Sequence, residues 1–300
     1  MKGTPMLMEK RANVLKSVAG SLVFPVIYVG LILILEYGYQ LIWNKPFTSV
    51  KLLINIIVFV LFFAIILIVF RVRKQSFLQR VRWNAPPKHV YWLVILLYVG
   101  VTVVSLAIGH LIPASWSAND TIDAATNDQN ILLILLVVGI LGPIAEETAF
   151  RGLMMTHLLS RVAPWLAVTI TAIAFAVTHG MDSLGHIFGA VPFAICICLM
   201  FYWTKSIRVT IMLHILNNVV VSLLEAAAPS SGSGSAYAGS PWEAVIVGVV
   251  GLAVTVLALV LIYRRSKKNQ LQPSAAEPVA AAQISGDQAC EINPKEDAHA

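Results

Sequence analysis

The sequence contains few charged residues and few cysteines. Only 12% of its 300 residues are charged, whereas soluble domains carry about 25%. This shortage, combined with 58% hydrophobic residues, excludes a soluble globular protein and indicates an integral membrane protein. Of the three cysteines, Cys196 and Cys198 lie two positions apart within an apolar run. Such a set predicts neither a disulfide framework nor a cysteine-based metal site.

Apolar runs of about 20 residues, long enough to cross a hydrocarbon core of about 30 Å, recur along the chain. We therefore predict an all-α, multi-pass transmembrane helical bundle with eight spans. The predicted spans are 18–42, 52–70, 90–113, 131–159, 164–179, 184–203, 207–224 and 242–263. The first run is long and is not followed by a small-residue cleavage pattern, so we expect a retained helix and no cleavable signal peptide.

Basic residues are distributed unevenly between the loops. Lys and Arg gather before the first span, in the second, fourth and sixth loops, and after the last span. The opposite side holds only Lys45 and Lys51, and its loop 114–130 carries three aspartates and no base. Because Lys and Arg are retained on the cytoplasmic side, both termini are predicted to be cytoplasmic. The net charge of +6 then reflects topology, and we expect a protein of the cell (plasma) membrane that contacts lipids and no nucleic acid.

Two adjacent glutamates and an arginine interrupt the apolar run 131–159. Ionised groups at membrane depth cost about 2.5 to 3.5 kcal/mol each on insertion scales, so they are rarely retained without a function. On a helix, Glu147 and Arg151 are four residues apart on one face and are predicted to neutralise each other. Glu146 points about 100° away and is the candidate general base. The alternative is a buried Glu–Arg pair that only fixes helix packing.

Two further polar clusters lie in later spans. His179 ends the run 164–179, and His214 and Asn218 lie one turn apart on one face of the span 207–224. Taken singly, the first could be an interfacial histidine and the second a pair that joins two helices. Taken together with the glutamates, these side chains can hold a water, polarise a carbonyl group and transfer a proton.

With these three motifs, the sequence resembles the CPBP intramembrane protease family, also called the CAAX prenyl-protease, Abi or bacteriocin-processing family. Its motifs EExxxR, FxxxH and HxxxN stand here at 146–151, 175–179 and 214–218, so the resemblance covers about 131–224. The resemblance implies an intramembrane endopeptidase that hydrolyses a peptide bond of a protein or peptide substrate. Prenylated CAAX peptides are the substrates of some members only, and nothing in this sequence selects them.

The resemblance also implies a set of site residues, namely Glu146, Glu147, Arg151, His179, His214 and Asn218. In this interpretation Glu146 activates water with the help of His179, and Glu147 holds Arg151. The remaining two residues bind either a metal or the oxyanion that develops on the scissile carbonyl group.

The use of a metal stays open at this point. The chain lacks a His-Glu-x-x-His helix, which would bind zinc. Glu146, His179 and His214 could still supply three ligands to a divalent metal such as zinc, with an open position for water. A glutamate that binds a metal is less available as a base, so a metal-free glutamate mechanism competes with this one.

A count of residues along the helices tests whether these groups lie at one depth. At 1.5 Å per residue, Glu146 and His179 lie about 20 and 23 Å from the basic end of their helices, but His214 lies only about 10 Å from that end. Either the seventh span begins before Ile207, or it tilts, or His214 is not in the site.

The motifs divide the chain into five predicted regions. These are a cytoplasmic N-terminus (1–17), three helices with their loops (18–130), the core with the three motifs (131–224), a linker with the last helix (225–265), and a disordered cytoplasmic tail (266–300). The tail is rich in Ala, Pro, Gln and Ser and cannot bury enough apolar surface to order itself. Within the fourth region, residues 229–240 have the Ser/Gly composition of a flexible linker.

Two other functions compete with proteolysis. Intramembrane acids and histidines also mark proton pathways, which would make the protein a proton-coupled transporter. The sequence shows neither the internal repeat nor the paired broken helices typical of such carriers. A non-catalytic membrane protein, such as a bacteriocin-immunity factor or a scaffold, would keep the fold without turnover.

Overall fold

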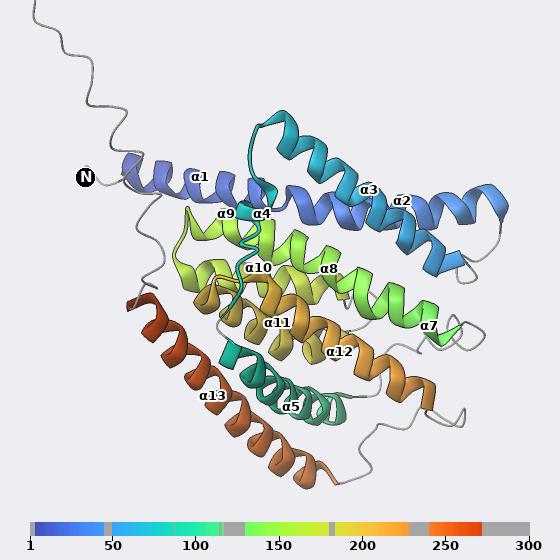
Figure 1. The fold of residues 1–300 in the computed structure, drawn as a ribbon, viewed down its shortest axis with the longest axis vertical. Helices are drawn as coiled ribbons and strands as arrows, with labels where there is room; N and C mark the ends of the chain where they lie inside the picture. The colour runs from blue at the N-terminus through green and yellow to red at the C-terminus, as the bar shows by residue number, and fades with distance from the viewer. Residues whose placement is uncertain are drawn as a thin grey trace, which may run out of the picture.

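The computed structural model describes residues 4–44, 50–86, 88–113, 116, 130–179, 184–227 and 240–271 (Figure 1). Within these residues the long helices lie side by side in a bundle, which confirms the predicted all-α fold. The helices are α1 (Thr4–Ser21), α2 (Val23–Trp43), α3 (Lys51–Val72), α4 (Phe77–Arg80), α5 (Lys88–Leu111), α7 (Ile131–Ile134), η3 (Leu135–Leu141), α8 (Gly142–Glu147), η4 (Thr148–Met155), α9 (Thr156–Leu159), α10 (Pro164–His179), α11 (Leu184–Thr204), α12 (Ile207–Ala227) and α13 (Pro241–Leu271).

In the part of the chain that the structure describes, seven helical stretches are long and apolar enough to cross a membrane, and the chain is an integral membrane protein. They are Asn13–Trp43, Lys51–Val72, Lys88–Leu111, Ile131–Leu159, Ile187–Thr204, Ile207–Leu224 and Pro241–Lys268. Of the eight predicted spans, α10 is the one that falls short. Its 16 residues extend about 24 Å, which is less than a hydrocarbon core of about 30 Å.

One predicted region boundary differs from the structure, and parts of three predicted segments lie outside the described residues. Helix α1 occupies most of the segment 1–17 that was predicted only as a cytoplasmic N-terminus. Helix α13 continues past Arg265 to Leu271, so it takes in the first residues of the predicted tail. The rest of the tail, all but the last residue of the linker 229–240, and the aspartates of the loop 114–130 lie outside the described residues.

The span Ile131–Leu159, which carries the two glutamates, is irregular. It consists of five consecutive pieces, of which η3 and η4 are π-helical. Pro143 stands at the first turn of α8, and because proline has no N–H to donate, the regular hydrogen-bond ladder is interrupted there. Short π-helical segments inside α-helices occur frequently at functional sites. Glu146 and Glu147 lie on the short α-helical piece between the two π-helical ones.

Helices α5 and α13 pack closely through glycines. A Cβ atom added at Gly100 would lie 2.7 Å from the backbone nitrogen of Thr255, and one added at Gly251 would lie 2.7 Å from Val103 Cγ1. Small residues allow such close approach of membrane helices, whose association depends on van der Waals packing. This contact holds α5 in place, and α5 forms one wall of the cavity described below.

Several basic loops meet at one end of the bundle. Asn84 donates a hydrogen bond to the carbonyl oxygen of Lys205 (3.1 Å), and the backbone N–H of Ile207 donates to Arg82 (3.1 Å). These bonds tie the segment between α4 and α5 to the turn between α11 and α12. Burial, and then the charge of the neighbouring Arg161, lower the pKa of the Arg80 guanidinium. Arg161 lies in the turn between α9 and α10, so this turn is at the same end of the bundle.

Candidate active site

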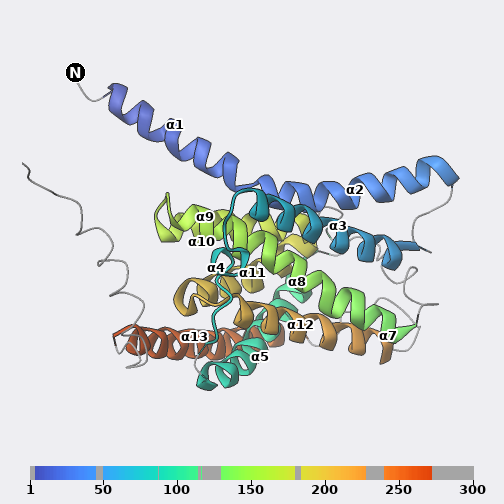
Figure 2. The ribbon, with the colours of Figure 1, turned by 45° about the horizontal axis from the view of Figure 1, so that its top comes forward.

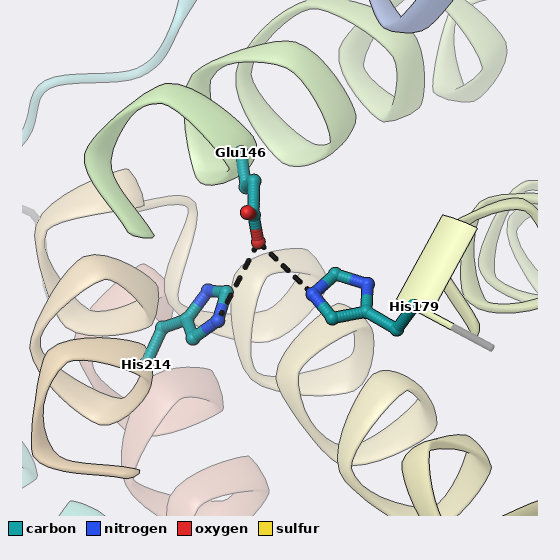
Figure 3. A group of neighbouring side chains, drawn as sticks. All are labelled: Glu146, His179 and His214. Atoms are coloured by element: carbon teal, nitrogen blue, oxygen red, sulfur yellow. Dashed lines mark ion pairs between the residues drawn. The ribbon is translucent and has the colours of Figure 1, made fainter. Parts of the chain in front are cut away.

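Glu146, His179 and His214 come together from three helices, α8, α10 and α12 (Figure 3). Glu146 Oε2 lies 3.1 Å from His179 Nε2 and 3.6 Å from His214 Nε2. His214 therefore lies in the site, although the residue count placed it lower than its partners. Helix α12 begins at Ile207 as predicted. The count assumed parallel and regular α-helices, whereas the helices are inclined to one another and the span that carries Glu146 is partly π-helical (Figure 2).

Glu147 joins two partners rather than one. Its Oε1 accepts hydrogen bonds from Arg151 Nη1 (2.9 Å) and from His214 Nδ1 (2.9 Å), and all three side chains are buried. The predicted pair between Glu147 and Arg151 is confirmed. The bond to His214 was not predicted, because it connects two motifs far apart in the sequence. Glu147 thus fixes both a buried charge and the orientation of a site histidine.

The hydrogen bonds at Nδ1 set the tautomer of both histidines. His179 Nδ1 lies 2.9 Å from the carbonyl oxygen of Phe175, and a carbonyl oxygen can only accept, so this Nδ1 carries a hydrogen. The same reasoning applies to His214 Nδ1 against the Glu147 carboxylate, which already accepts from Arg151. In its neutral form, each imidazole then directs the lone pair of Nε2 toward Glu146.

This arrangement brings acceptor atoms together. Glu146 Oε2 is buried and makes no hydrogen bond, in spite of its approach to His179. Lone pairs on two imidazoles and a carboxylate repel one another unless a positive charge lies among them. A proton on one imidazole supplies such a charge, and so does a bound cation.

The same three side chains also fit a divalent metal. One ligand atom from each lies within 4.8 Å of the others. Histidines that bind metals commonly donate their other ring N–H to a carboxylate or a backbone carbonyl, as His179 and His214 both do here. Two imidazoles and a carboxylate are ligands that zinc accepts. The donor set is therefore compatible with zinc and with a shared proton.

The ring of Phe175 contacts both Arg151 and His179. The Arg151 guanidinium lies 4.1 Å from the centre of its ring, and the His179 ring lies 4.1 Å from it on a tilted plane. Arg151 Nε and Nη2 make no hydrogen bond, so the aromatic face gives the buried cation a second favourable contact. The motif FxxxH contains this residue, but sequence reasoning gave it no role.

Tyr28 contacts Glu146, which the sequence did not predict. Its hydroxyl lies 3.5 Å from Glu146 Oε1, at the long limit for a hydrogen bond, and its ring packs against Phe62 with ring centres 5.1 Å apart. Tyr28 comes from α2, outside the segment that carries the three motifs. The one available signal was a phenol in an apolar span, because a buried tyrosine hydroxyl usually finds a polar partner.

Asn218 lies near the histidines and bonds to the irregular helix. Its Nδ2 donates to the carbonyl oxygen of Val138 in η3 (3.0 Å), and its Oδ1 accepts from Asn217 (3.2 Å). One N–H of the amide stays available for another acceptor. The predicted role of Asn218 toward a metal or an oxyanion stays a prediction.

A cavity of about 510 Å³ adjoins the site. It lies between α5, α10, α11 and α12, and its polar lining includes His179, His214, Asn217 and Asn218. Phe175 and Phe193 belong to its apolar part. A substrate that filled this cavity would contact both histidines.

The central part of the chain matches a known family. Residues 128–220 match the model described as type II CAAX prenyl endopeptidase Rce1-like, and they contain all three motifs. The resemblance predicted from the motifs is thereby confirmed.

Two curated proteins are similar to the chain. An uncharacterized 24.3 kDa protein of Escherichia coli is 34% identical over 116 residues, which cover 34% of this chain and 52% of that protein. The membrane-embedded CAAX protease MroQ of Staphylococcus aureus (strain USA300) is 23% identical over 177 residues, which cover 56% of this chain and 70% of MroQ. The chain thus spans about half the length of the first relative. No solved structure matches the chain significantly.

Proposed function

From the match of residues 128–220 to the type II CAAX prenyl endopeptidase Rce1-like family, we propose that this membrane protein is an intramembrane endopeptidase. It hydrolyses a peptide bond of a protein or peptide substrate at or within the membrane. One observation carries the proposal. A buried carboxylate oxygen of Glu146 lies within 3.1 and 3.6 Å of two imidazole nitrogens that come from separate helices.

In the proposed reaction, Glu146 acts as the general base. A water beside Glu146 Oε2 loses a proton to the carboxylate while its oxygen attacks the carbonyl carbon of the scissile bond. The proton then passes to the amine as the carbon–nitrogen bond breaks. Tyr28 supports this role because its hydroxyl approaches the other oxygen of the same carboxylate and limits its rotation.

The oxyanion of the intermediate needs hydrogen-bond donors nearby. His179 in its protonated form donates from Nε2, because its Nδ1 is already held by the carbonyl of Phe175. The free N–H of Asn218 is the second proposed donor. Loss of one such donor typically lowers kcat by about 100-fold to 1,000-fold.

If the protein holds a divalent metal, the proposed ligands are Glu146, His179 and His214. Such a metal polarises the scissile carbonyl and makes a bound water more acidic. The hydrogen bonds that His214 donates to Glu147 and that His179 donates to the carbonyl oxygen of Phe175 keep both Nε2 atoms directed at the same point, with or without a metal.

Cleavage of a peptide library by the detergent-purified protein tests the proposal. The library contains prenylated and unprenylated peptides, and the assay is run with and without a chelator. Wild-type protein is expected to cleave, while Glu146→Gln and His179→Ala do not. Proton-coupled solute flux in proteoliposomes, without cleavage, would identify a carrier instead. Full biological activity of both variants would identify a non-catalytic protein.

A further inference from the structure

The cavity beside the site histidines lies in one half of the bundle. On α5 its lining residues fall within 101–109, in the second half of that helix, and Ile112 directly follows the helix. On α11 they fall within 185–193, in the first half, and on α10 they are Phe175 and His179 near its last turn. On α12 all of them except His214 lie in the middle or the second half.

The basic residues gather at the opposite ends of the same helices. Helix α5 begins after the segment whose Asn84 binds the carbonyl of Lys205, which directly follows α11. Helix α10 begins after Arg161, and Arg208 lies in the first turn of α12. The described basic residues at this end include Arg71, Arg73, Lys74, Arg80, Arg82, Lys88, Arg161, Lys205, Arg208, Arg264, Arg265, Lys267 and Lys268.

Exposure rises along the cavity away from the basic end. At the inner end, Val101 and His214 are 1% and 2% exposed. Nearer the far end, Leu106 and Val221 are 49% and 39% exposed. The His179 side chain, at the end of α10, is 34% exposed. Among the described lining residues, the cavity is therefore buried near the middle of the bundle and more exposed toward the end opposite the basic loops.

The walls of the cavity are suited to an uncharged chain. Among the described lining residues, only the two histidines can carry a charge, and polar groups are limited to side chains such as Thr102, Ser105 and Asn217. A Cβ atom added at Gly109 or Gly189 would meet nothing within 4 Å, so both glycines leave open space along the wall. An apolar peptide segment can lie there with its backbone bonded to the few polar side chains.

We propose that this cavity opens on the non-cytoplasmic side of the membrane and binds the apolar segment of a peptide that arrives from that side. The orientation follows from the basic loops, because Lys and Arg are retained in the cytoplasm during insertion. The substrate class is thus an exported or translocated peptide that stays associated with the membrane. This inference rests on the proposed protease function for its substrate, but the sidedness of the cavity can be measured without any cleavage.

Cysteine labelling in spheroplasts of a bacterial expression host tests the sidedness. The background carries Cys196→Ala, Cys198→Ala and Cys290→Ser, and single cysteines are introduced as Gly109→Cys in the cavity wall or Gln75→Cys at the basic end. Gln75 is exposed in the turn between α3 and α4, so it serves as the matched control. A membrane-impermeant maleimide is added before or after permeabilisation. We expect Gly109→Cys to react in intact spheroplasts and Gln75→Cys to react only after permeabilisation.

The opposite pattern, or a Gly109→Cys that reacts in neither condition, would overturn the proposed opening.

Peptide cleavage tests whether the substrate lies in this cavity, and Gly109→Trp should lower it at least 10-fold. Gly38→Trp, at another glycine whose added Cβ meets nothing within 4 Å, should cleave like the wild type. Normal cleavage by Gly109→Trp would remove the cavity as the substrate site. External labelling of Gly109→Cys, together with no cleavage by the wild-type protein, would reject the proposed function while the sidedness stands.

Discussion

Glu147 Oε1 accepts a hydrogen bond from His214 Nδ1 at 2.9 Å, although the two residues are 67 positions apart in the chain. The same oxygen accepts from Arg151, so one buried carboxylate links the first and third motifs. It neutralises the guanidinium and holds the imidazole with Nε2 directed at Glu146. The second glutamate of the motif is therefore a positioning residue for the histidine as well as a partner of the arginine.

Replacement of Glu147 should destabilise the protein strongly. In Glu147→Ala the buried Arg151 loses its partner, and removal of one member of a buried pair costs about 3 to 5 kcal/mol. Thermal unfolding in detergent measures the effect. The double variant Glu147→Gln, Arg151→Met should regain part of the loss, because no unpaired charge is then left in the interior. Unfolding of Glu147→Ala at the wild-type temperature would contradict the role given to this pair.

Tyr28→Phe should slow cleavage without unfolding the protein. The substitution removes the 3.5 Å contact with Glu146 Oε1 and keeps the ring that packs on Phe62. A hydrogen bond is worth about 0.5 to 1.5 kcal/mol net, which corresponds to a rate about 2-fold to 10-fold lower. Tyr39→Phe on the same helix is the control, since Tyr39 stacks on Trp43. Equal kcat values for Tyr28→Phe and Tyr39→Phe would show that Tyr28 does not position Glu146.

The three side chains at the centre of the site should bind zinc when it is supplied. Calorimetric titration of the purified protein is expected to show a single zinc site that is lost in His214→Ala. The site should be unchanged in the control His157→Ala, because His157 lies in α9, near the other end of the helical span that carries Glu146. If the wild type binds no zinc, the positive charge between Glu146 and the two histidines must come from a proton on one imidazole. Peptide cleavage that survives exhaustive chelation would show that the reaction follows the glutamate mechanism without a metal.

The contact between α5 and α13 should tolerate no side chain at Gly100. In Gly100→Ala the new methyl group would lie 2.7 Å from backbone and side-chain atoms of Thr255, and overpacking of this kind costs about 1 to 3 kcal/mol. Gly109→Ala on the same helix is the matched control, because its Cβ meets nothing within 4 Å. Thermal unfolding should separate the two variants. Equal stability would mean that the helices are not so closely packed.

The sequence was sufficient for those features that depend on local spacing. The hydrophobic runs located the spans, and the spacing of four residues predicted the pair between Glu147 and Arg151. The motifs also identified the two histidines that meet at Glu146. Those features follow from the period of a helix and from the cost of ions in an apolar medium.

Contacts between distant helices could not be read in the same way. A residue count placed His214 too low, because it could not anticipate the inclination of the helices or the π-helical segments around Glu146. Nothing in the spacing of α2 indicated that Tyr28 faces Glu146 across the bundle. The extension of α13 beyond Arg265 was missed because composition marked that segment as polar, while its helix continues from the span.

If Glu146 is the base of a peptidase, its replacement must slow the reaction, and the most direct measurement is the turnover of a cleaved peptide by wild type and Glu146→Gln. General-base catalysis typically contributes about 100-fold to 10,000-fold, so kcat should fall by that range while the unfolding temperature is nearly unchanged. Glu243→Gln, an exposed glutamate at the start of α13, should keep the wild-type kcat. Turnover by Glu146→Gln at the wild-type rate would show that Glu146 is not the base.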